Sequence, residues 1–145
     1  MPVPLIQRCR VLKRLSDLHS PVVEQLILAH FIEQGHLERH IMQMRKLYRK
    51  RRIALINALT THFPGQVHIH GDATGLHLVA EFPGINFTES RVEEMRQAGV
   101  RVCPVELHAI RKGYHCNKVI MGYGNLTEAE IEEGVARMKR LQSNT

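Results

Sequence analysis

The sequence predicts an α+β fold in which long helices come first and a small mixed β-sheet covered by helices follows. Up to about residue 62, apolar side chains recur at intervals of three, four and seven residues, a period typical of amphipathic helices. After Pro64 and Gly65 the pattern changes to the alternation that is typical of strands. The second half then has the order β-β-α-β-β-α, which predicts two layers, one of strands and one of helices.

Three helices are expected before this change of pattern. The first covers residues 4–17, and the second follows Ser20 and Pro21, which suit an N-cap and a first helical turn. Gly35 ends the second helix, because glycine is the usual residue just after a helix C-terminus. The third helix, residues 36–62, is the longest periodic segment of the chain.

The predicted sheet begins with a hairpin. Apolar residues alternate on either side of a turn at residues 72–75, so that Ile69 and Leu78 lie on the same face. Thr88 is predicted to cap the helix that follows the hairpin. The next expected elements are a strand at 100–105, a loop at 106–117 and a strand at 118–123.

The last helix has the clearest start signal. Thr127 and Glu130 have the spacing of a capping box, in which each side chain accepts a hydrogen bond from the backbone N–H of the other residue. Leu126 precedes the cap and is placed to pack on Ile131 as a hydrophobic staple. These residues predict a helix that runs to about Leu141.

Composition excludes several classes of protein. With 43% apolar and 23% charged residues, the chain is globular and not a disordered tail. No apolar run is long enough to span a membrane, and basic residues interrupt the N-terminal segment, so we predict a cytoplasmic protein. Cys9, Cys103 and Cys116 lack metal-type spacing and are expected to be reduced. No nucleophile elbow occurs, and we predict no catalytic residue in this chain.

Positive charge is concentrated in one helix. The net charge is +6, and residues 39–52 hold seven bases and no acid, while the remainder of the chain is slightly acidic. Such a cluster is either a nucleic-acid-binding face or part of a solvent-exposed helix between domains. The candidate binding residues of this cluster are Arg45, Arg49, Arg51 and Arg52. Arg52 falls on the apolar side of the helix, where an arginine usually has an acidic or phosphate partner.

Histidine is frequent, with ten copies. In the predicted hairpin, His70 pairs with His77, which places His68 and Glu81 on the same face as both of them. Three histidines around an open position are one pattern of catalytic zinc. A solvated polar sheet face explains the same residues, and no further metal motif occurs, so we predict no metal site.

The order of several motifs resembles that of a known family. The segment LKRLSDLHSPVVEQLILAHFIEQG precedes GDATGLHLVAEFP, which is followed by AGVRVCPV and VIMGYGNLTEAEIEEGVARM. Together these segments resemble the C-terminal part of fold-type I pyridoxal-phosphate aminotransferases. The likeness is greatest to the aminotransferase-like domain of MocR-type regulators in the GntR family, and it runs from about Pro4 to Leu141.

This resemblance implies three parts and a cofactor. Residues 1–35 would be the last helices of the large cofactor-binding domain, 36–62 the helix joining two domains, and 63–145 the small C-terminal domain. The family holds pyridoxal phosphate through a lysine in a Ser-x-x-Lys turn upstream of the matching segment, and no lysine of this chain has that context. We therefore expect a fragment that is inactive alone and does not bind the cofactor covalently, because the chemistry requires that amine.

The resemblance also implies individual sites and partners. His19 and Ser20 match residues that lie near the cofactor phosphate in the family, often across a dimer interface. Ile120 matches the strand position where many aminotransferases place a carboxylate-binding arginine, which puts the usual amino-acid recognition in doubt. The expected partner is a second copy or a complementary N-terminal aminotransferase polypeptide. DNA would be contacted through an N-terminal winged helix, which this sequence lacks.

Overall fold

The computed structural model describes residues 2–17, 21–71, 73 and 75–143. Its packing divides the chain into two units, residues 1–43 and residues 44–145. The boundary falls inside helix α3 (His36–His62), so that the larger, C-terminal part of this helix belongs to the second unit. The division into three parts that the resemblance implies, at residues 35 and 62, stays a prediction.

The first unit consists of helix α1 (Val3–Asp17), helix α2 (Val22–Glu33) and the start of α3. Helix α2 is apolar around its whole circumference, yet none of its residues is buried. The predicted stop is confirmed, because Gly35 has φ of 69° and its N–H donates to the carbonyl of Ile32 at 2.9 Å.

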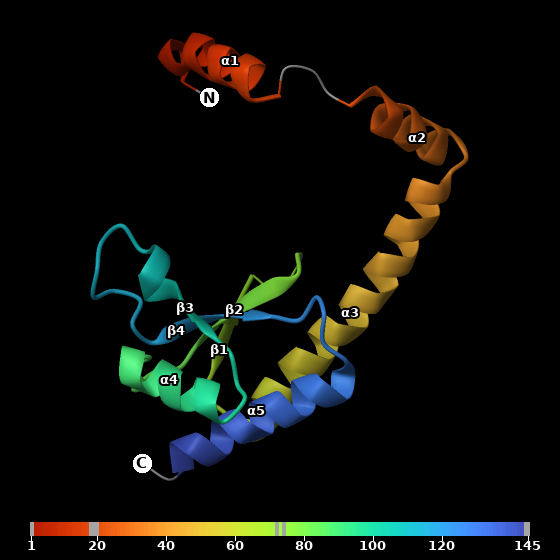
Figure 1. Ribbon diagram of the computed structural model, residues 1–145. Coiled ribbons are helices and arrows are strands. Elements are labelled where there is room, and N and C mark those ends of the chain that lie inside the picture. Colours follow the sequence, from red (N-terminus) through yellow and green to blue (C-terminus); the bar gives the residue numbers. More distant parts are fainter. Residues whose placement is uncertain (1, 18–20, 72, 74, 144–145) are drawn as a thin grey trace. The chain divides into compact units, whose positions relative to one another are not determined.

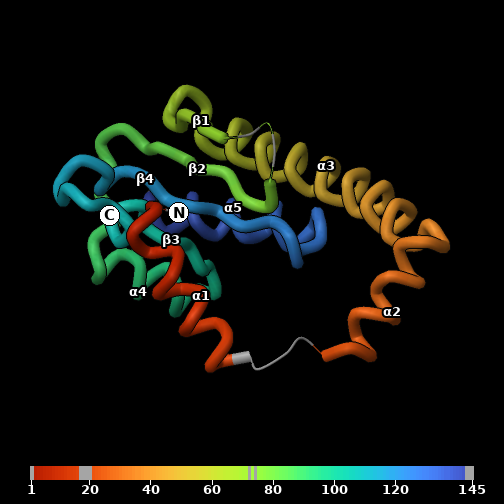
Figure 2. Tube along the Cα trace, turned by 90° about the horizontal axis from the view of Figure 1, so that it is seen from above, coloured from red at the N-terminus to blue at the C-terminus, as the bar shows by residue number. Residues whose placement is uncertain are grey.

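The second unit is a four-stranded sheet with helices on one face. Its strands are β1 (His68–His70), β2 (His77–Glu81), β3 (Cys103–Pro104) and β4 (Lys118–Gly122). They lie in the order β1-β2-β4-β3. Every pairing is antiparallel, where a mixed sheet was predicted. Helices α4 (Glu89–Gln97) and α5 (Glu128–Ser143) and the end of α3 form the helical layer (Figure 1), and β2 and β4 cross over α5 in Figure 2.

The core of this unit lies between the sheet and the three helices. Phe82 packs edge to face on Phe63 and on Phe87, with ring centroids 5.1 and 5.6 Å apart. The largest fully buried side chains are those of Phe63, Phe82, Tyr123, Leu59, Leu78, Met95, Met138, Val119 and Val135. All of them come from the second unit. The core of the predicted α+β fold is therefore formed by residues that follow the boundary at residue 43.

Both predicted helix starts in this unit are confirmed. The Thr88 hydroxyl accepts a hydrogen bond from the N–H of Arg91 at 3.4 Å. In the capping box, the N–H of Thr127 donates to the Glu130 carboxylate at 2.7 Å and the N–H of Glu130 donates to the Thr127 hydroxyl at 3.2 Å. The backbone at each of these helix starts is therefore satisfied by side chains close in sequence.

The strand predicted at residues 100–105 is much shorter in the structure. Only Cys103 and Pro104 pair with β4, although Val100 and Val102 are buried as the alternation predicted. Pro104 has no N–H for a ladder, and it begins the short 3-10 helix η1 (Val105–His108), which occupies the start of the predicted loop. None of the described helices combines the length and the apolarity that a membrane crossing requires.

Candidate functional site

The sheet face opposite the helices carries several of the residues that the sequence singled out. Strand pairing places His70 beside Val79, Val79 beside Ile120, and Ile120 beside Cys103, so these four residues form one row across the sheet. Ile120 is partly buried in the middle of this row. An apolar side chain therefore occupies the place where the resemblance implied an arginine in many relatives.

The predicted register of the hairpin is wrong by two residues. His70 pairs with Val79 and His68 pairs with Glu81, whereas His77 pairs with Gly122 of β4 and not with β1. The physical reason is that the connection between β1 and β2 is longer than predicted. The first two residues of β2, His77 and Leu78, pair with β4 and not with β1. Since the error is an even number, the three histidines still share the open face with Glu81.

Glu81 is the centre of a polar cluster on this face. Its carboxylate lies 2.8 Å from Nε2 of His70 and 3.6 Å from Nζ of Lys118, and it accepts a hydrogen bond from Nδ2 of Asn117 at 3.1 Å. The hydrogen bonds from His70 and then from Asn117 lower the pKa of the Glu81 carboxyl below its ordinary value. The cluster joins β1, β2 and β4, which is a structural role.

The histidines of the zinc alternative have different surroundings in the structure. Throughout the described ranges, no group of three or more His, Cys, Asp and Glu side chains is arranged to hold a metal ion. His70 is instead paired with Glu81, and His68 and His77 are exposed.

The connection between η1 and β4 is organised by one carboxylate. Glu106 accepts hydrogen bonds from the backbone N–H groups of Gly113 and His115, the latter at 3.0 Å. Lys112 closes the same turn, since its Nζ donates to the carbonyl of Glu106 at 2.7 Å. Gly113 has φ of 91°, a conformation that side-chain-bearing residues rarely adopt. The backbone hydrogen bond from Gly113 is the main reason that the pKa of Glu106 lies below its ordinary value.

This connection borders an open surface pocket that the sequence did not predict. The pocket has a volume of about 560 Å³. It is lined by His108, Ala109, Ile110, Arg111, Tyr114 and His115. His108 also lies 3.4 Å, measured from Nε2, from Sγ of Cys103 at the end of the row across the sheet. A loop with several histidines, an arginine and a tyrosine was the available signal, but only folding brings these side chains around one space.

The basic helix has two kinds of arginine. Arg51 donates to the carbonyl of Gly124, and Nη1 of Arg52 donates to the carbonyl of Ala73 at 2.7 Å. Among the described residues, Arg52 therefore has a backbone carbonyl as its partner, and the acidic or phosphate partner expected for it stays a prediction. Arg45 and Arg49 are exposed and make no hydrogen bond or ion pair within the described residues.

The residues expected near a cofactor phosphate are not placed. His19 and Ser20 lie outside the described residues, so their role stays a prediction. Three lysines of the second unit have defined contacts. Lys112 donates to backbone carbonyls, Lys118 pairs with Glu81, and Nζ of Lys139 lies 5.1 Å from the centroid of the Phe63 ring.

Comparison with known proteins gives related sequences over almost the whole chain. Two uncharacterised HTH-type transcriptional regulators of Bacillus subtilis (strain 168), YhdI and YdeL, are 32% and 30% identical to it over 94% and 96% of its length. The chain spans only 28% and 30% of these relatives. A crystal structure of a multiple substrate aminotransferase from Thermococcus profundus matches 98% of the chain and 35% of its own length, with 25% identity and a TM-score of 0.83. No protein-family model matches the chain.

These findings identify the fold of the chain and the kind of proteins that are related to it. The fold is that of part of a fold-type I aminotransferase, and the second unit corresponds to the small domain of such enzymes. The homologues are HTH-type regulators of the MocR type together with aminotransferases, as the resemblance of the motifs indicated.

The donor set of the described residues can be compared with what pyridoxal phosphate needs. That cofactor requires an amine for its aldehyde and several donors for its phosphate. Lys112, Lys118 and Lys139 are engaged in contacts that hold loops and helices together. His19 and Ser20, which the resemblance places near the phosphate, lie outside the described residues, so the described residues contain only part of the expected donor set.

Proposed function

We propose that this chain is an aminotransferase-like part of a MocR-type protein that performs no transamination alone and requires a complementary large-domain polypeptide. The single observation that supports this most is helix α2. Leu26, Ile27 and Phe31 are 66%, 64% and 40% exposed, although a helix that is apolar all round is normally buried in a large domain. The covering surface would come from the part of the fold that the relatives have beyond the matched third.

Pyridoxal phosphate is the cofactor that the aminotransferase relatives imply for the family, and its binding by this chain needs a separate argument. Relatives include aminotransferases, and a solved aminotransferase from Thermus thermophilus, LysN, is complexed with N-(5'-phosphopyridoxyl)-L-leucine. We propose that this chain forms no internal Schiff base, because none of its lysines has the sequence context of the family lysine, and Lys112, Lys118 and Lys139 have structural contacts.

The test is spectroscopic and uses the whole chain. Purified protein is incubated with pyridoxal phosphate, and the absorbance at roughly 410–430 nm, where an internal aldimine is expected, is recorded with the Thermococcus profundus enzyme as positive control. The expected result is no stable band and no transfer of an amino group. A band that survives dialysis and maps to one lysine after borohydride reduction would contradict the proposal.

A complementation experiment tests the second part of the proposal. The region of YhdI that this chain does not match is produced separately, mixed with the 145-residue chain, and analysed by size-exclusion chromatography. Co-elution, which is lost when Leu26 is replaced by Glu, is the expected result. Elution of two separate species at all concentrations would contradict the need for such a partner.

A second candidate function is binding of nucleic acid by the helix that includes residues 39–52. Arg45 and Arg49 favour it, because both are exposed and make no contact within the described residues. Fluorescence anisotropy with duplex DNA should then show binding that weakens steeply with added salt and is reduced in the Arg45→Gln, Arg49→Gln variant. Absence of binding at low salt would end this hypothesis.

A further inference from the structure

The pocket in the connection between η1 and β4 has an unusual set of side chains. His108, Arg111, Tyr114 and His115 all line it, and each carries a hydrogen-bond donor or can carry one. No carboxylate is among the lining residues. A space of about 560 Å³ is within the usual range of small-molecule sites. The pocket is therefore suited in size and charge to a small anion.

Two of these side chains lack partners. Arg111 is exposed and makes no hydrogen bond or ion pair within the described residues. Nδ1 of His115 is buried, and no hydrogen-bond partner for it is present in the described part of the chain. Buried polar atoms in proteins are nearly always hydrogen-bonded, so this nitrogen lacks a partner, which is an acceptor or a donor according to the tautomer of the ring.

The acidic residue of the same connection does not fill that place. The Glu106 carboxylate is engaged by the backbone N–H groups of Gly113 and His115. These contacts fix the backbone of the loop at Gly113 and His115, close to Arg111, before a ligand arrives. Because these two N–H groups already donate to Glu106, they are not free to bind a phosphate, as backbone N–H groups do in many phosphate-binding loops.

We propose that this pocket binds a small carboxylate ligand. The planar guanidinium of Arg111 presents two parallel N–H donors that match the two carboxylate oxygens, and the imidazole of His115 lines the same space. Tyr114 and the apolar Ile110 border the space for the remainder of the ligand. This proposal is independent of the proposed function, because every residue it uses lies in the second unit and none is needed for cofactor chemistry.

The experiment follows the histidine side chains of the whole 145-residue chain by NMR. Protein labelled with 15N is titrated with sodium succinate, with inorganic phosphate, and with sodium chloride at matched ionic strength. We expect succinate to shift the ring resonances of His115 saturably, and phosphate and chloride to shift them less. In Arg111→Gln, succinate affinity should fall about tenfold or more, which is the usual effect of losing a charge-assisted hydrogen bond.

The controls separate site binding from general attraction to a basic protein. Arg10→Gln removes an exposed arginine from α1 and should leave succinate affinity unchanged. Arg111→Lys keeps the charge without the planar fork and should bind with reduced affinity. Equal shifts in the wild type and Arg111→Gln, shifts that do not saturate, or tighter binding of phosphate than of succinate would each overturn the carboxylate assignment.

Discussion

At the scale of single residues, the arginines of α3 differ in what they contact. Arg51 is half-buried and donates to the carbonyl of Gly124, 73 residues away in sequence, and it also lowers the pKa of Glu130 by its charge, after the larger effect of hydrogen bonds from Thr127. Arg49 is exposed and makes no contact within the described residues. A count of positive charges treats these two residues as equal, but their energetic roles are different.

This difference can be measured by substitution. Replacing Arg51 by Met leaves the Gly124 carbonyl without its charged donor and should lower the free energy of unfolding by about 1.5–3 kcal/mol. Arg49→Met should change it by no more than about 0.5 kcal/mol, as is usual for an exposed side chain. Urea unfolding of both variants compares the two values. Equal effects would show that the Arg51 contact does not stabilise the fold.

Glu106 should make stability depend on pH. Its pKa is lower in the folded protein than in the unfolded chain, chiefly because of the Gly113 N–H, so its contribution is present above the unfolded pKa and is lost as pH falls through the folded pKa. Replacing Glu106 by Gln should lower the urea midpoint near pH 7 and have progressively less effect at acidic pH. The control is Glu89→Gln, at an exposed position in the first turn of α4. A constant difference at all pH values would contradict this linkage.

At the scale of elements, helix caps show how local sequence determines where helices begin. Thr127 takes part in a reciprocal capping box, whereas Thr88 accepts one longer hydrogen bond from the N–H of Arg91. Thr127→Ala is therefore expected to lower the free energy of unfolding by about 1 kcal/mol, within the range of cap substitutions. Thr88→Ala should cost less. Chemical denaturation of the two variants tests this order, and a larger loss for Thr88→Ala would reverse it.

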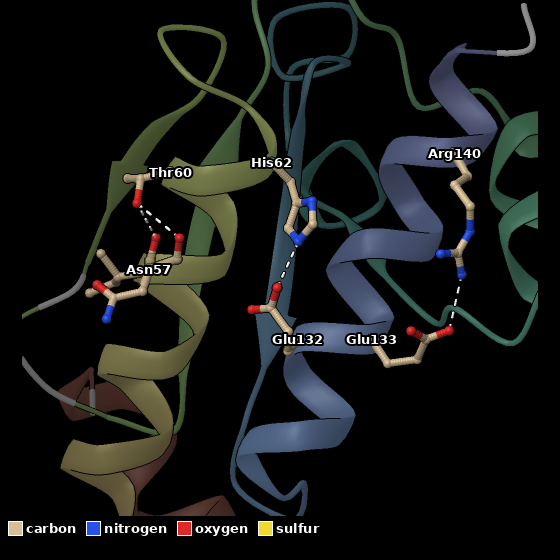
Figure 3. A network of polar contacts seen from close by, with 7 residues as sticks. Asn57, Thr60, His62, Glu132, Glu133 and Arg140 are labelled. Atoms are coloured by element: carbon tan, nitrogen blue, oxygen red, sulfur yellow. Dashed lines mark hydrogen bonds and ion pairs between the residues drawn. The ribbon is translucent and has the colours of Figure 1, made fainter.

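The helical layer is also joined by polar contacts at its surface. Nε2 of His62, at the end of α3, lies 2.7 Å from the Glu132 carboxylate on α5, and Glu133 pairs with Arg140, which lies about two turns further along α5 (Figure 3). Thr60 donates back to the carbonyls of Ile56 and Asn57. The Glu132 side chain is 56% exposed, so its pair with His62 contributes little energy and mainly fixes the alignment of two helices already packed through their apolar faces.

At the scale of the whole molecule, the distribution of the core predicts where stability resides. Every buried residue belongs to the range 55–138 among the described residues, and the first unit contributes none. A polypeptide of residues 44–145 should therefore fold alone and unfold cooperatively, with a urea midpoint close to that of the full chain. Circular dichroism during urea titration measures this. A broad, non-cooperative transition would show that residues 1–43 are required for the fold.

The exposed helices of the first unit predict association. Leu12 and Leu15 on α1 are 65% and 71% exposed, and α2 has no buried residue. Exposed apolar surface of this kind is usually covered by a partner or by self-association. We expect light scattering to show oligomers of the full chain that grow with concentration, and a monomer for residues 44–145. A monomeric full chain at all concentrations would contradict this expectation.

Much of the fold could be predicted because the relevant signals are local. The capping box at Thr127 and Glu130, the cap at Thr88 and the stop at Gly35 each depend on residues only a few positions apart. The hairpin register could not be predicted in the same way, because His77 pairs with Gly122 of β4, a strand that is far from β2 in sequence. The strand around Cys103 was overestimated because Val100 and Val102 alternate and are buried without pairing with β4, and because η1 begins directly after Pro104.

The candidate sites also differ in whether local sequence could predict them. Ile120 was placed correctly on a strand by its sequence pattern, and its lack of a positive charge is a property of the sequence alone. The pocket at Arg111 and His115 was not predicted, because its walls depend on how Glu106 folds the loop back on itself. Spacing along the chain contains no information on that closure.

The sequence by itself determined the α+β class, the helix ends, the faces of the strands and the likeness to an aminotransferase-like family, since these depend on periodicity and on short motifs. Tertiary structure decided which strand His77 joins, which arginines are used inside the fold, and which loop side chains meet around a pocket. The physical reason is that hydrogen bonds such as that from Arg51 to Gly124 connect residues far apart in sequence. Their geometry exists only after the sheet and helices have packed together.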